Sequence, residues 1–208
     1  MLHKRREKFR FQEKLIVNIL GKLPITPNEW TLISLAFVFI GLYFTITHKF
    51  ALALVFFVVS LFLDIVDGAI ARAKNMVSNR GAYIDTVVDR YVEGIMLFGL
   101  LFIPYFPVII FPIQIWIALS IFGFMITTYS KAAAYEKQLK EEAIQSTLEK
   151  SFLIKRAERA IFYFSIYLTV ILNQFYIAAI ILIAFAVLTN ITAVRKILAF
   201  VKYERNNL

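Results

Sequence analysis

The sequence predicts an all-α integral membrane protein with six transmembrane helices and an N-terminal amphipathic helix at the membrane surface. The 208 residues are 60% hydrophobic and only 18% charged, and their mean hydropathy is +0.72. This balance is more apolar than a soluble core of this size requires. Apolar runs of membrane-spanning length recur along the chain, and Lys and Arg collect in every second connection between them. We therefore expect a polytopic membrane domain.

Residues 1–22 form the first predicted element. Their basic and aromatic residues suit an amphipathic helix lying on the membrane surface, with a solvated basic tail as the alternative. The stretch "LPITPNEWT" then opens the first transmembrane helix, because Thr26 can cap it and Pro27 sits where a missing N–H costs nothing. We therefore divide the chain into a juxtamembrane segment, 1–22, and a six-helix membrane domain, 23–208.

The six transmembrane helices follow from the apolar runs, each of which is long enough to cross a hydrocarbon layer of about 30 Å. In chain order they cover residues 29–47, 50–72, 81–103, 108–134, 152–172 and 174–194.

The basic residues predict the orientation. Seven Lys and Arg precede the first span, three lie in the second connection, six lie between 131 and 156, and four follow the last span, whereas the other connections carry one or none. The positive-inside rule therefore places both termini and the basic loops on the cytoplasmic side of the cell membrane. Because the net charge of +9 is spread over these loops, we expect anionic membrane lipids as its partner and no nucleic acid.

All the aspartates of the chain lie in the second and third spans: Asp64, Asp67, Asp85 and Asp89. At a rise of about 1.5 Å per residue, Asp64 and Asp89 lie about 21 to 22 Å from the outer ends of their helices, and the other two about 25 to 28 Å. The i, i+3 and i, i+4 spacings put each pair on one helix face. Two antiparallel neighbours would therefore bring four carboxylates together, with the active site on the cytoplasmic side.

Buried carboxylates at this depth need compensation. Each aspartate near a membrane centre costs about 2.5 to 3.5 kcal/mol on insertion scales, so the four are not expected to face lipid. An all-carboxylate set favours a hard divalent ion such as Mg²⁺, Mn²⁺ or Ca²⁺ over zinc, and it suits a pair of ions. One alternative is separate carboxylates that pair with Arg72, Arg80 and Arg90. Another is a cation transporter, which would need more polar groups toward the outer face than these helices carry.

The residues from Asp64 to Asp89 spell DxxDGxxARx8GxxxDxxxD without a gap or substitution. This pattern resembles the signature of the CDP-alcohol phosphotransferase family, and "TPNEWT" resembles the TPNxxT motif of its first helix. The resemblance implies transfer of a phosphoalcohol from a CDP-linked donor to the hydroxyl of a second alcohol, with release of CMP. It also implies a homodimer.

The resemblance assigns roles to the motif residues. Asp64, Asp67 and Asp85 would bind divalent ions, Mg²⁺ or Mn²⁺ and two in number, with help from Asp89. Asp89 would also be the general base. The CDP-donor pocket would be formed by small and polar residues around the motif, namely Asn28, Gly68, Ala71, Arg72 and Gly81.

Two further segments, "TTYSKAAAYE" and "KRAERAIF", are similar to members of the family that transfer to inositol phosphate, although Ala133 stands where those members have an arginine. The resemblance therefore implies that Lys131, Arg159 and Arg156 hold the acceptor phosphate, with membrane anchoring as the alternative for Lys131 and Arg156. In the same branch the last aspartate of the motif often begins the sequence DRYxD. In this chain Glu93 stands at the final position of that sequence.

We therefore expect an archaetidyl- or phosphatidylinositol phosphate synthase, with a CDP-linked lipid donor and a polar phosphoalcohol acceptor. The alternatives within the family are a synthase that joins CDP-inositol to inositol phosphate, and an enzyme with glycerol phosphate or serine as acceptor.

Overall fold

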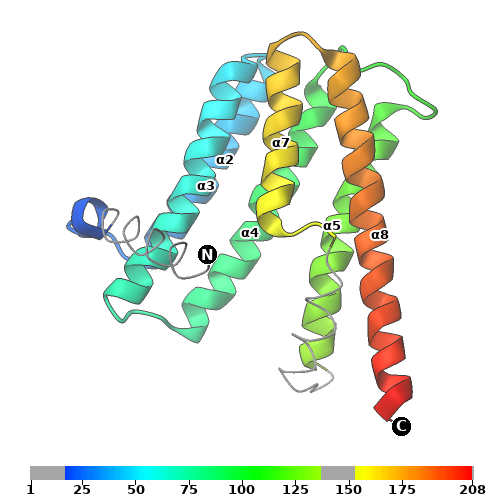
Figure 1. The fold of residues 1–208 in the computed structure, drawn as a ribbon. Coiled ribbons are helices and arrows are strands. Elements are labelled where there is room, and N and C mark those ends of the chain that lie inside the picture. The colour runs from blue at the N-terminus through cyan, green and yellow to red at the C-terminus, as the bar shows by residue number, and fades with distance from the viewer. Residues whose placement is uncertain (1–16, 137–152, 208) are drawn as a thin grey trace, which may run out of the picture. The chain divides into compact units, whose positions relative to one another are not determined.

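The computed structural model describes residues 17–136 and 153–207, and the regular elements within these residues are helices (Figure 1). The predicted all-α class is therefore confirmed. The amphipathic helix predicted for residues 1–22 lies mostly outside the described residues. The elements are α2 (Pro27–Ile46), α3 (Phe50–Ala73), α4 (Asn79–Gly99), the 3-10 helix η1 (Leu100–Phe102), α5 (Ile113–Glu136), α7 (Arg156–Ile171) and α8 (Phe175–Asn207).

The chain divides into two compact units at Met96. The first unit contains α2, α3 and most of α4, and the second contains η1, α5, α7 and α8. Each unit has its own buried apolar residues, and each is described by itself below.

Helix α2 begins where the sequence predicts. The Thr26 side chain accepts a hydrogen bond from the Glu29 backbone N–H at 3.4 Å, and the Thr26 backbone N–H donates to Glu29 Oε2 at 2.6 Å. Pro27 is the first helical residue. This reciprocal capping satisfies N–H groups that a helix start otherwise leaves open, so α2 starts at a defined residue.

Helices α2 and α3 pack side by side in the first unit (Figure 1). Trp30 of α2 and the α3 residues Leu63, Val66 and Ile70 form a buried cluster. The Ser60 hydroxyl also donates to the backbone O of Ser34 at 2.7 Å, which joins the two helices directly. The start of α2 is therefore fixed against the half of α3 that carries Asp64 and Asp67.

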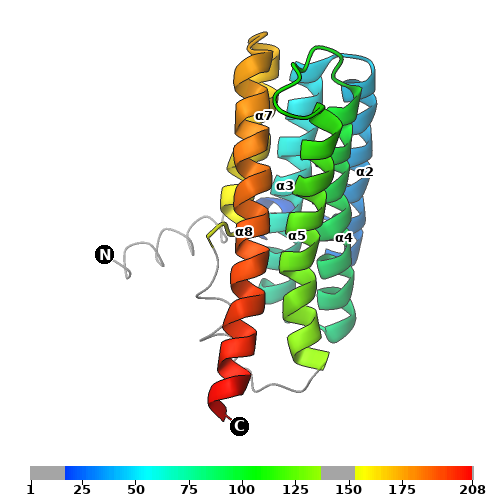
Figure 2. The same ribbon diagram turned by 90° about the vertical axis from the view of Figure 1, so that its right-hand side faces the viewer.

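Helices α5 and α8 lie side by side in the second unit (Figures 1 and 2). Asn190 Nδ2 of α8 donates to the backbone O of Leu119 of α5 at 2.8 Å. Lys196 of α8 is fully buried, and its Nζ donates to the backbone O of Thr127 at 2.6 Å. The sequence prediction counted Lys196 only as a basic residue after the last span.

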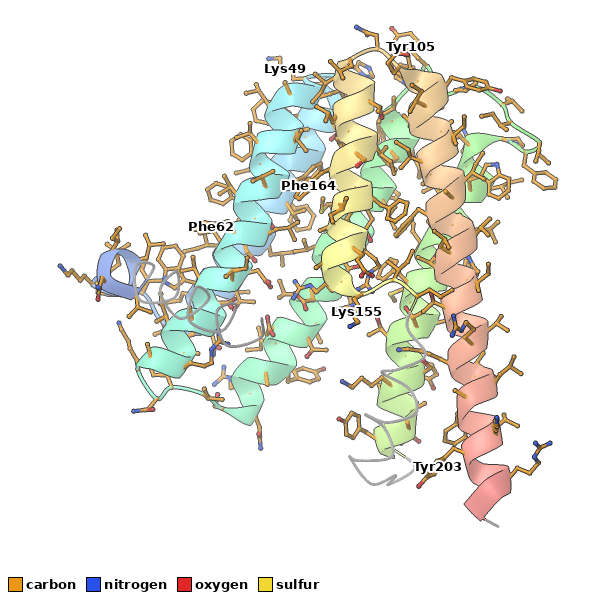
Figure 3. All side chains as sticks on the ribbon, viewed as in Figure 1. Lys49, Phe62, Tyr105, Lys155, Phe164 and Tyr203 are labelled. Atoms are coloured by element: carbon orange, nitrogen blue, oxygen red, sulfur yellow. The ribbon has the colours of Figure 1, made fainter. Side chains whose placement is uncertain are left out.

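Four of the described helices are long and apolar enough to cross a membrane: α2, α3, α5 and residues Phe175–Tyr203 of α8. Large apolar side chains project outward from them, as Phe62 of α3 does with 43% exposure (Figure 3). These findings support an integral membrane protein. Helix α4 contains five charged residues, and α7 has only 16 residues. Length and composition therefore support four of the six predicted spans, and these two helices are not among the four.

Several helix boundaries differ from the prediction, including those of α5, α7 and α8. Helix α5 begins at Ile113 and not at 108, because Pro112 disfavours helical backbone in the residue before it, and Ile110 has a φ of 62°. Helix α7 begins at Arg156 and not at 152, since the Lys155 backbone N–H is capped by Glu158 Oε2 at 2.6 Å. Helix α8 runs on to Asn207, beyond the predicted end at 194.

Gly123→Ala should destabilise the packing of α5 on α8. A Cβ at position 123 would lie 2.5 Å from Thr189 Oγ1 and 2.9 Å from Asn190 Nδ2. Overpacking of this kind costs about 1 to 3 kcal/mol, which corresponds to a Tm lower by a few degrees. Thermal unfolding in detergent tests this against Phe122→Leu, a control at a side chain that is 66% exposed. Equal Tm values for both variants would contradict the packing described here.

Candidate active site

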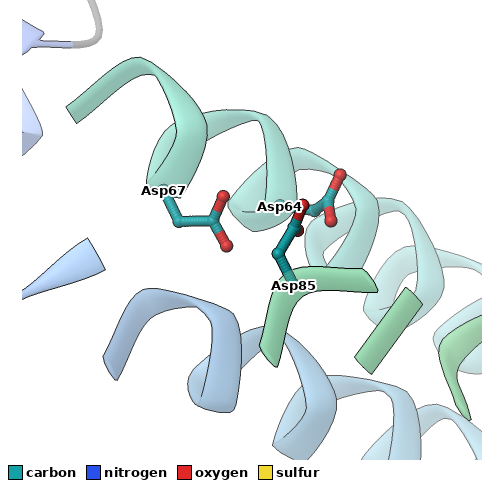
Figure 4. Close-up of side chains that lie close together, drawn as sticks. All are labelled: Asp64, Asp67 and Asp85. Carbon is teal, nitrogen blue, oxygen red and sulfur yellow. The ribbon is translucent and has the colours of Figure 1, made fainter. Parts of the chain in front are cut away.

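Three carboxylates form the centre of the site. Asp64 and Asp67 of α3 and Asp85 of α4 each offer an oxygen, and these oxygens lie within 4.8 Å of one another (Figure 4). Asp67 is buried and the other two are half-buried. Carboxylate oxygens at this spacing are a donor set that fits a hard divalent cation such as Mg²⁺ or Mn²⁺.

Local structure explains why these residues meet. Asp64 and Asp67 are three residues apart on α3 and therefore share a helix face. A short connection after Ala73, in which Asn75 has a φ of 55°, then reverses the chain into α4, which begins at Asn79. Asp85 thereby returns to the level of the α3 pair, as the matched depths of the sequence predict.

Asp89 lies one helical turn beyond Asp85, and within the described residues the group of three does not include it. Its Oδ2 lies 3.3 Å from Nη2 of Arg90. The second nitrogen of that guanidinium, Nη1, lies 3.3 Å from Oε1 of Glu93. The structure therefore brings three of the four aspartates into one group and places the fourth in a neighbouring ion-pair network, so a part for Asp89 in metal binding stays a prediction.

Thr31 of α2 is a residue of the site that sequence reasoning missed. Its hydroxyl donates to Asp67 Oδ2 at 2.5 Å and also lies 3.1 Å from the backbone O of Pro27. The side chain is 4% exposed, so this hydrogen bond forms away from water. A buried carboxylate needs such donors. The sequence signal that could have identified Thr31 is its place as the last residue of "TPNEWT".

A pocket of about 330 Å³ adjoins the carboxylates. The beginning of α2, the end of α3, the connection at residues 76–78 and the beginning of α4 line it. Asp67 and Asp85 belong both to this lining and to the carboxylate group. All the residues predicted for a donor pocket line it, namely Asn28, Gly68, Ala71, Arg72 and Gly81, and the sequence reasoning missed Pro27, Thr31, Met76, Val77, Ser78 and Ala82.

Two glycines of the pocket leave no space for a side chain without movement of a neighbour. A Cβ at Gly81 would lie 3.1 Å from Asn28 Oδ1 and 3.2 Å from Ser78 Oγ. A Cβ at Gly68 would lie 3.3 Å from Nη1 of Arg72. The glycines therefore keep polar side chains close to the backbone at the pocket wall.

The predicted acceptor residues lie in the second unit, and the carboxylate group and pocket are built without them. Arg159 of α7 is 5% exposed, whereas Arg156 is the half-buried first residue of that helix. Lys131 of α5 is half-buried, and its Nζ lies 5.9 Å from the ring centre of Tyr135. A role in phosphate binding stays a prediction for all three.

Known proteins share both sequence and fold with this chain. Archaetidylinositol phosphate synthase of Pyrococcus horikoshii is 36% identical over 100 residues, which are 48% of this chain and 53% of that protein. A bifunctional IPC transferase and DIPP synthase of Aquifex aeolicus is 29% identical over 152 residues, which are 68% of this chain and 32% of that protein. The matches thus span about half of the first relative's length and a third of the second's.

Two solved structures of Mycobacterium tuberculosis phosphatidylinositol phosphate synthase (PgsA1) have the same fold, each at 21% identity. The complex with manganese and citrate has a TM-score of 0.75 over 90% of this chain and 88% of that one. The complex with CDP-DAG has a TM-score of 0.74 over 91% and 93%. Residues 24–192 of this chain, which include most of its helices, match the CDP-alcohol phosphatidyltransferase family. This chain therefore belongs to the CDP-alcohol phosphatidyltransferase family.

Proposed function

We propose that this chain is an enzyme of phospholipid biosynthesis. It transfers a phosphatidyl or archaetidyl group from a CDP-linked lipid to a hydroxyl of inositol phosphate and releases CMP. The observation that carries the proposal is that Asp67 and Asp85 belong both to the carboxylate group and to the pocket lining. A diphosphate bound in the pocket would therefore lie beside the residues that could hold divalent ions.

The proposed cofactor is a pair of Mg²⁺ or Mn²⁺ ions held by Asp64, Asp67 and Asp85, with Asp89 assisting. Such ions neutralise a diphosphate and stabilise the leaving oxygen of CMP. The PgsA1 structure with manganese supports this choice of ion. Thr31 orients Asp67 within the set through its hydrogen bond.

The pocket is proposed to hold the cytidine and diphosphate of the donor, and the PgsA1 complex with CDP-DAG supports a donor of this kind. The guanidinium of Arg72 supplies positive charge there, suited to a phosphate. Asn28, Gly68, Ala71 and Gly81 shape the remaining wall.

Asp89 is proposed as the general base. It takes the proton of the acceptor hydroxyl, the hydroxyl oxygen forms a bond to the donor phosphorus next to the lipid, and the bond from that phosphorus to the oxygen of CMP breaks. Asp89 follows Asp85 by one helical turn, which supports a position of its carboxylate beside the proposed ions.

Inositol phosphate is the proposed acceptor, with its phosphate held by Lys131, Arg159 and Arg156. Arg159 is a buried residue of α7, and a guanidinium suits the geometry of a phosphate. The names of the Pyrococcus and Mycobacterium relatives support this acceptor. A synthase that joins CDP-inositol to inositol phosphate is the second candidate, favoured by the Aquifex relative named for DIPP synthesis.

The proposed topology keeps six spans, with α4 and α7 as the two that composition does not identify. Helix α4 and η1 together cover Asn79–Phe102, about 36 Å at 1.5 Å per residue, which is enough to cross the hydrocarbon layer. Both termini and the active site then face the cytoplasmic side of the cell membrane. The proposed homodimer rests on the family resemblance alone.

The central experiment follows CMP release from purified protein with CDP-diacylglycerol, CDP-archaeol or CDP-inositol, each offered with inositol phosphate, glycerol phosphate, serine or free inositol. Excess EDTA should abolish release, and Asp64→Asn or Asp67→Asn should lower it at least about 100-fold, because even the outer partners of metal ligands contribute about 10- to 100-fold. Tyr83→Phe, at an exposed side chain on α4, is the control. Full turnover in EDTA would contradict the metal assignment.

Asp89→Asn should lose turnover by about 10²- to 10⁴-fold, the usual contribution of a general base. Binding of the CDP-linked donor should remain measurable, because the group of three carboxylates stays intact. Donor binding by fluorescence or calorimetry is compared with turnover in the same preparation. A parallel loss of both would make Asp89 a metal ligand only.

Arg159→Ala should raise the acceptor KM about 10- to 100-fold, since a hydrogen bond to a charged group contributes about 1.5 to 3 kcal/mol. The donor KM should stay nearly unchanged, because the proposed donor residues all lie in the first unit. Lys202→Ala, at an exposed residue of α8, is the matched charge control. Preference for a non-phosphorylated acceptor, or damage chiefly to donor binding, would overturn the assignment of Arg159.

A further inference from the structure

The Thr31 hydroxyl has one proton and two acceptors within reach. Its Oγ1 lies 2.5 Å from Asp67 Oδ2 and 3.1 Å from the backbone O of Pro27. A hydroxyl has a single proton to donate, and the shorter distance is typical of a hydrogen bond from O–H to a carboxylate. The proton therefore lies toward Asp67, and this carboxylate of α3 has a donor that comes from α2.

Thr45, at the other end of α2, uses its hydroxyl differently. It is also buried, and it donates to the backbone O of Gly41, four residues earlier, at 3.0 Å. This bond stays within one helix, which is a common arrangement for a helical threonine. Thr31 has the equivalent backbone oxygen within reach, yet its shorter contact crosses to another helix. Its hydroxyl therefore serves the carboxylate and not its own helix.

Packing between α2 and α3 fixes the position of this donor. Trp30, the residue before Thr31, lies in a buried cluster with Val66, the residue before Asp67. Thr31 and Asp67 are each 4% exposed, so water does not compete for the hydrogen bond between them. The donor is thus in place before any ion binds, as a preorganised ligand requires.

The hydrogen bond limits how Asp67 can bind an ion. A carboxylate that rotates freely can give an ion one oxygen or both, and Ca²⁺ readily accepts both, whereas Mg²⁺ demands a smaller, near-octahedral set of ligands. Because Oδ2 receives the Thr31 proton, the rotation of the carboxylate is restrained. Asp67 can therefore offer one oxygen without disturbance, and turning both toward one ion would strain or break the bond to Thr31.

We propose that Thr31 is a positioning residue that acts through Asp67 to favour Mg²⁺ or Mn²⁺ over Ca²⁺. It does so by holding Asp67 as a ligand that gives one oxygen to an ion. This inference rests on the proposed function, in which Asp67 binds divalent ions, and it requires no contact of Thr31 with the ion itself.

The test measures ion binding without substrate in purified wild-type protein and in T31V, T31A and T31S. T31V keeps the shape of threonine and loses the hydroxyl, T31A loses the hydroxyl and volume, and T31S keeps the hydroxyl. The Kd for Mn²⁺, from the electron paramagnetic resonance signal of the free ion, should rise about 10- to 100-fold in T31V and T31A, the usual effect of losing an outer partner of a ligand. T31S should bind Mn²⁺ nearly as tightly as the wild-type protein.

Competition of Ca²⁺ against bound Mn²⁺ tests the choice of ion. Without the Thr31 hydroxyl, Asp67 can turn both oxygens toward Ca²⁺ and so compensate for part of the loss. The Kd for Ca²⁺ should therefore rise less than the Kd for Mn²⁺ in T31V, and the ratio of the two constants should fall several-fold. In the CMP-release assay, T31V should need more Mg²⁺ for half-maximal turnover.

A matched control separates this role from helix packing. T45V removes another buried threonine hydroxyl from α2. It should leave the Kd for Mn²⁺ at the wild-type value, whatever its effect on the Tm in EDTA. The rise in Tm that a fixed, subsaturating Mn²⁺ concentration produces depends on the Kd. This rise should therefore be smaller in T31V than in T45V.

Four results would each overturn the inference: unchanged Mn²⁺ affinity in T31V and T31A, an equal loss of affinity in T31S, a matching loss in T45V, or an unchanged ratio of the Ca²⁺ and Mn²⁺ constants in T31V. The proposed function would stand in each case if the wild-type protein binds Mn²⁺ and releases CMP. A wild-type protein that binds no Mn²⁺ and releases no CMP with any donor and acceptor pair would overturn the proposed function and this inference with it.

Discussion

The structure of the first unit depends on holding three carboxylates of α3 and α4 together. Asp64, Asp67 and Asp85 repel one another and lose hydration where they lie, so each needs hydrogen-bond donors or a cation. The Thr31 hydroxyl meets part of this need for Asp67. That hydrogen bond requires the beginning of α2 to lie against α3, which the cap at Thr26 and the cluster around Trp30 secure. The pocket is the space that this arrangement leaves.

The positions of the aspartates could be predicted because they depend on helix geometry alone. A fixed rise and a fixed number of residues per turn match Asp67 with Asp85, and Asp64 with Asp89, in depth along two antiparallel helices. The ion pair of Asp89 with Arg90 could not be predicted in this way, because it depends on the side-chain conformations of both residues. The Thr31 contact joins residues 36 apart in the sequence and depends on packing between helices, so periodicity carries no signal for it.

The helix count shows a related limit of hydropathy. Helix α4 carries the charges of the site, so its composition no longer resembles that of a lipid-facing helix. The prediction of spans at α4 and α7 therefore rests more on the distribution of Lys and Arg in the connections than on the apolar content of these two helices. Boundaries that depend on single backbone features, such as the φ of 62° at Ile110 before Pro112, were likewise outside what apolar runs can predict.

On the proposed function, the two halves of the reaction make different demands on the sequence. Ions require oxygen ligands at fixed distances, so the carboxylates of α3 and α4 must keep their spacing and their short side chains. An acceptor phosphate can be held by long cationic side chains from several positions, because charge attraction tolerates more variation in geometry. An alanine at position 133 is therefore compatible with phosphate binding by Lys131 and Arg159. It follows that the acceptor depends on charge placement in the second unit, and not on the aspartate motif.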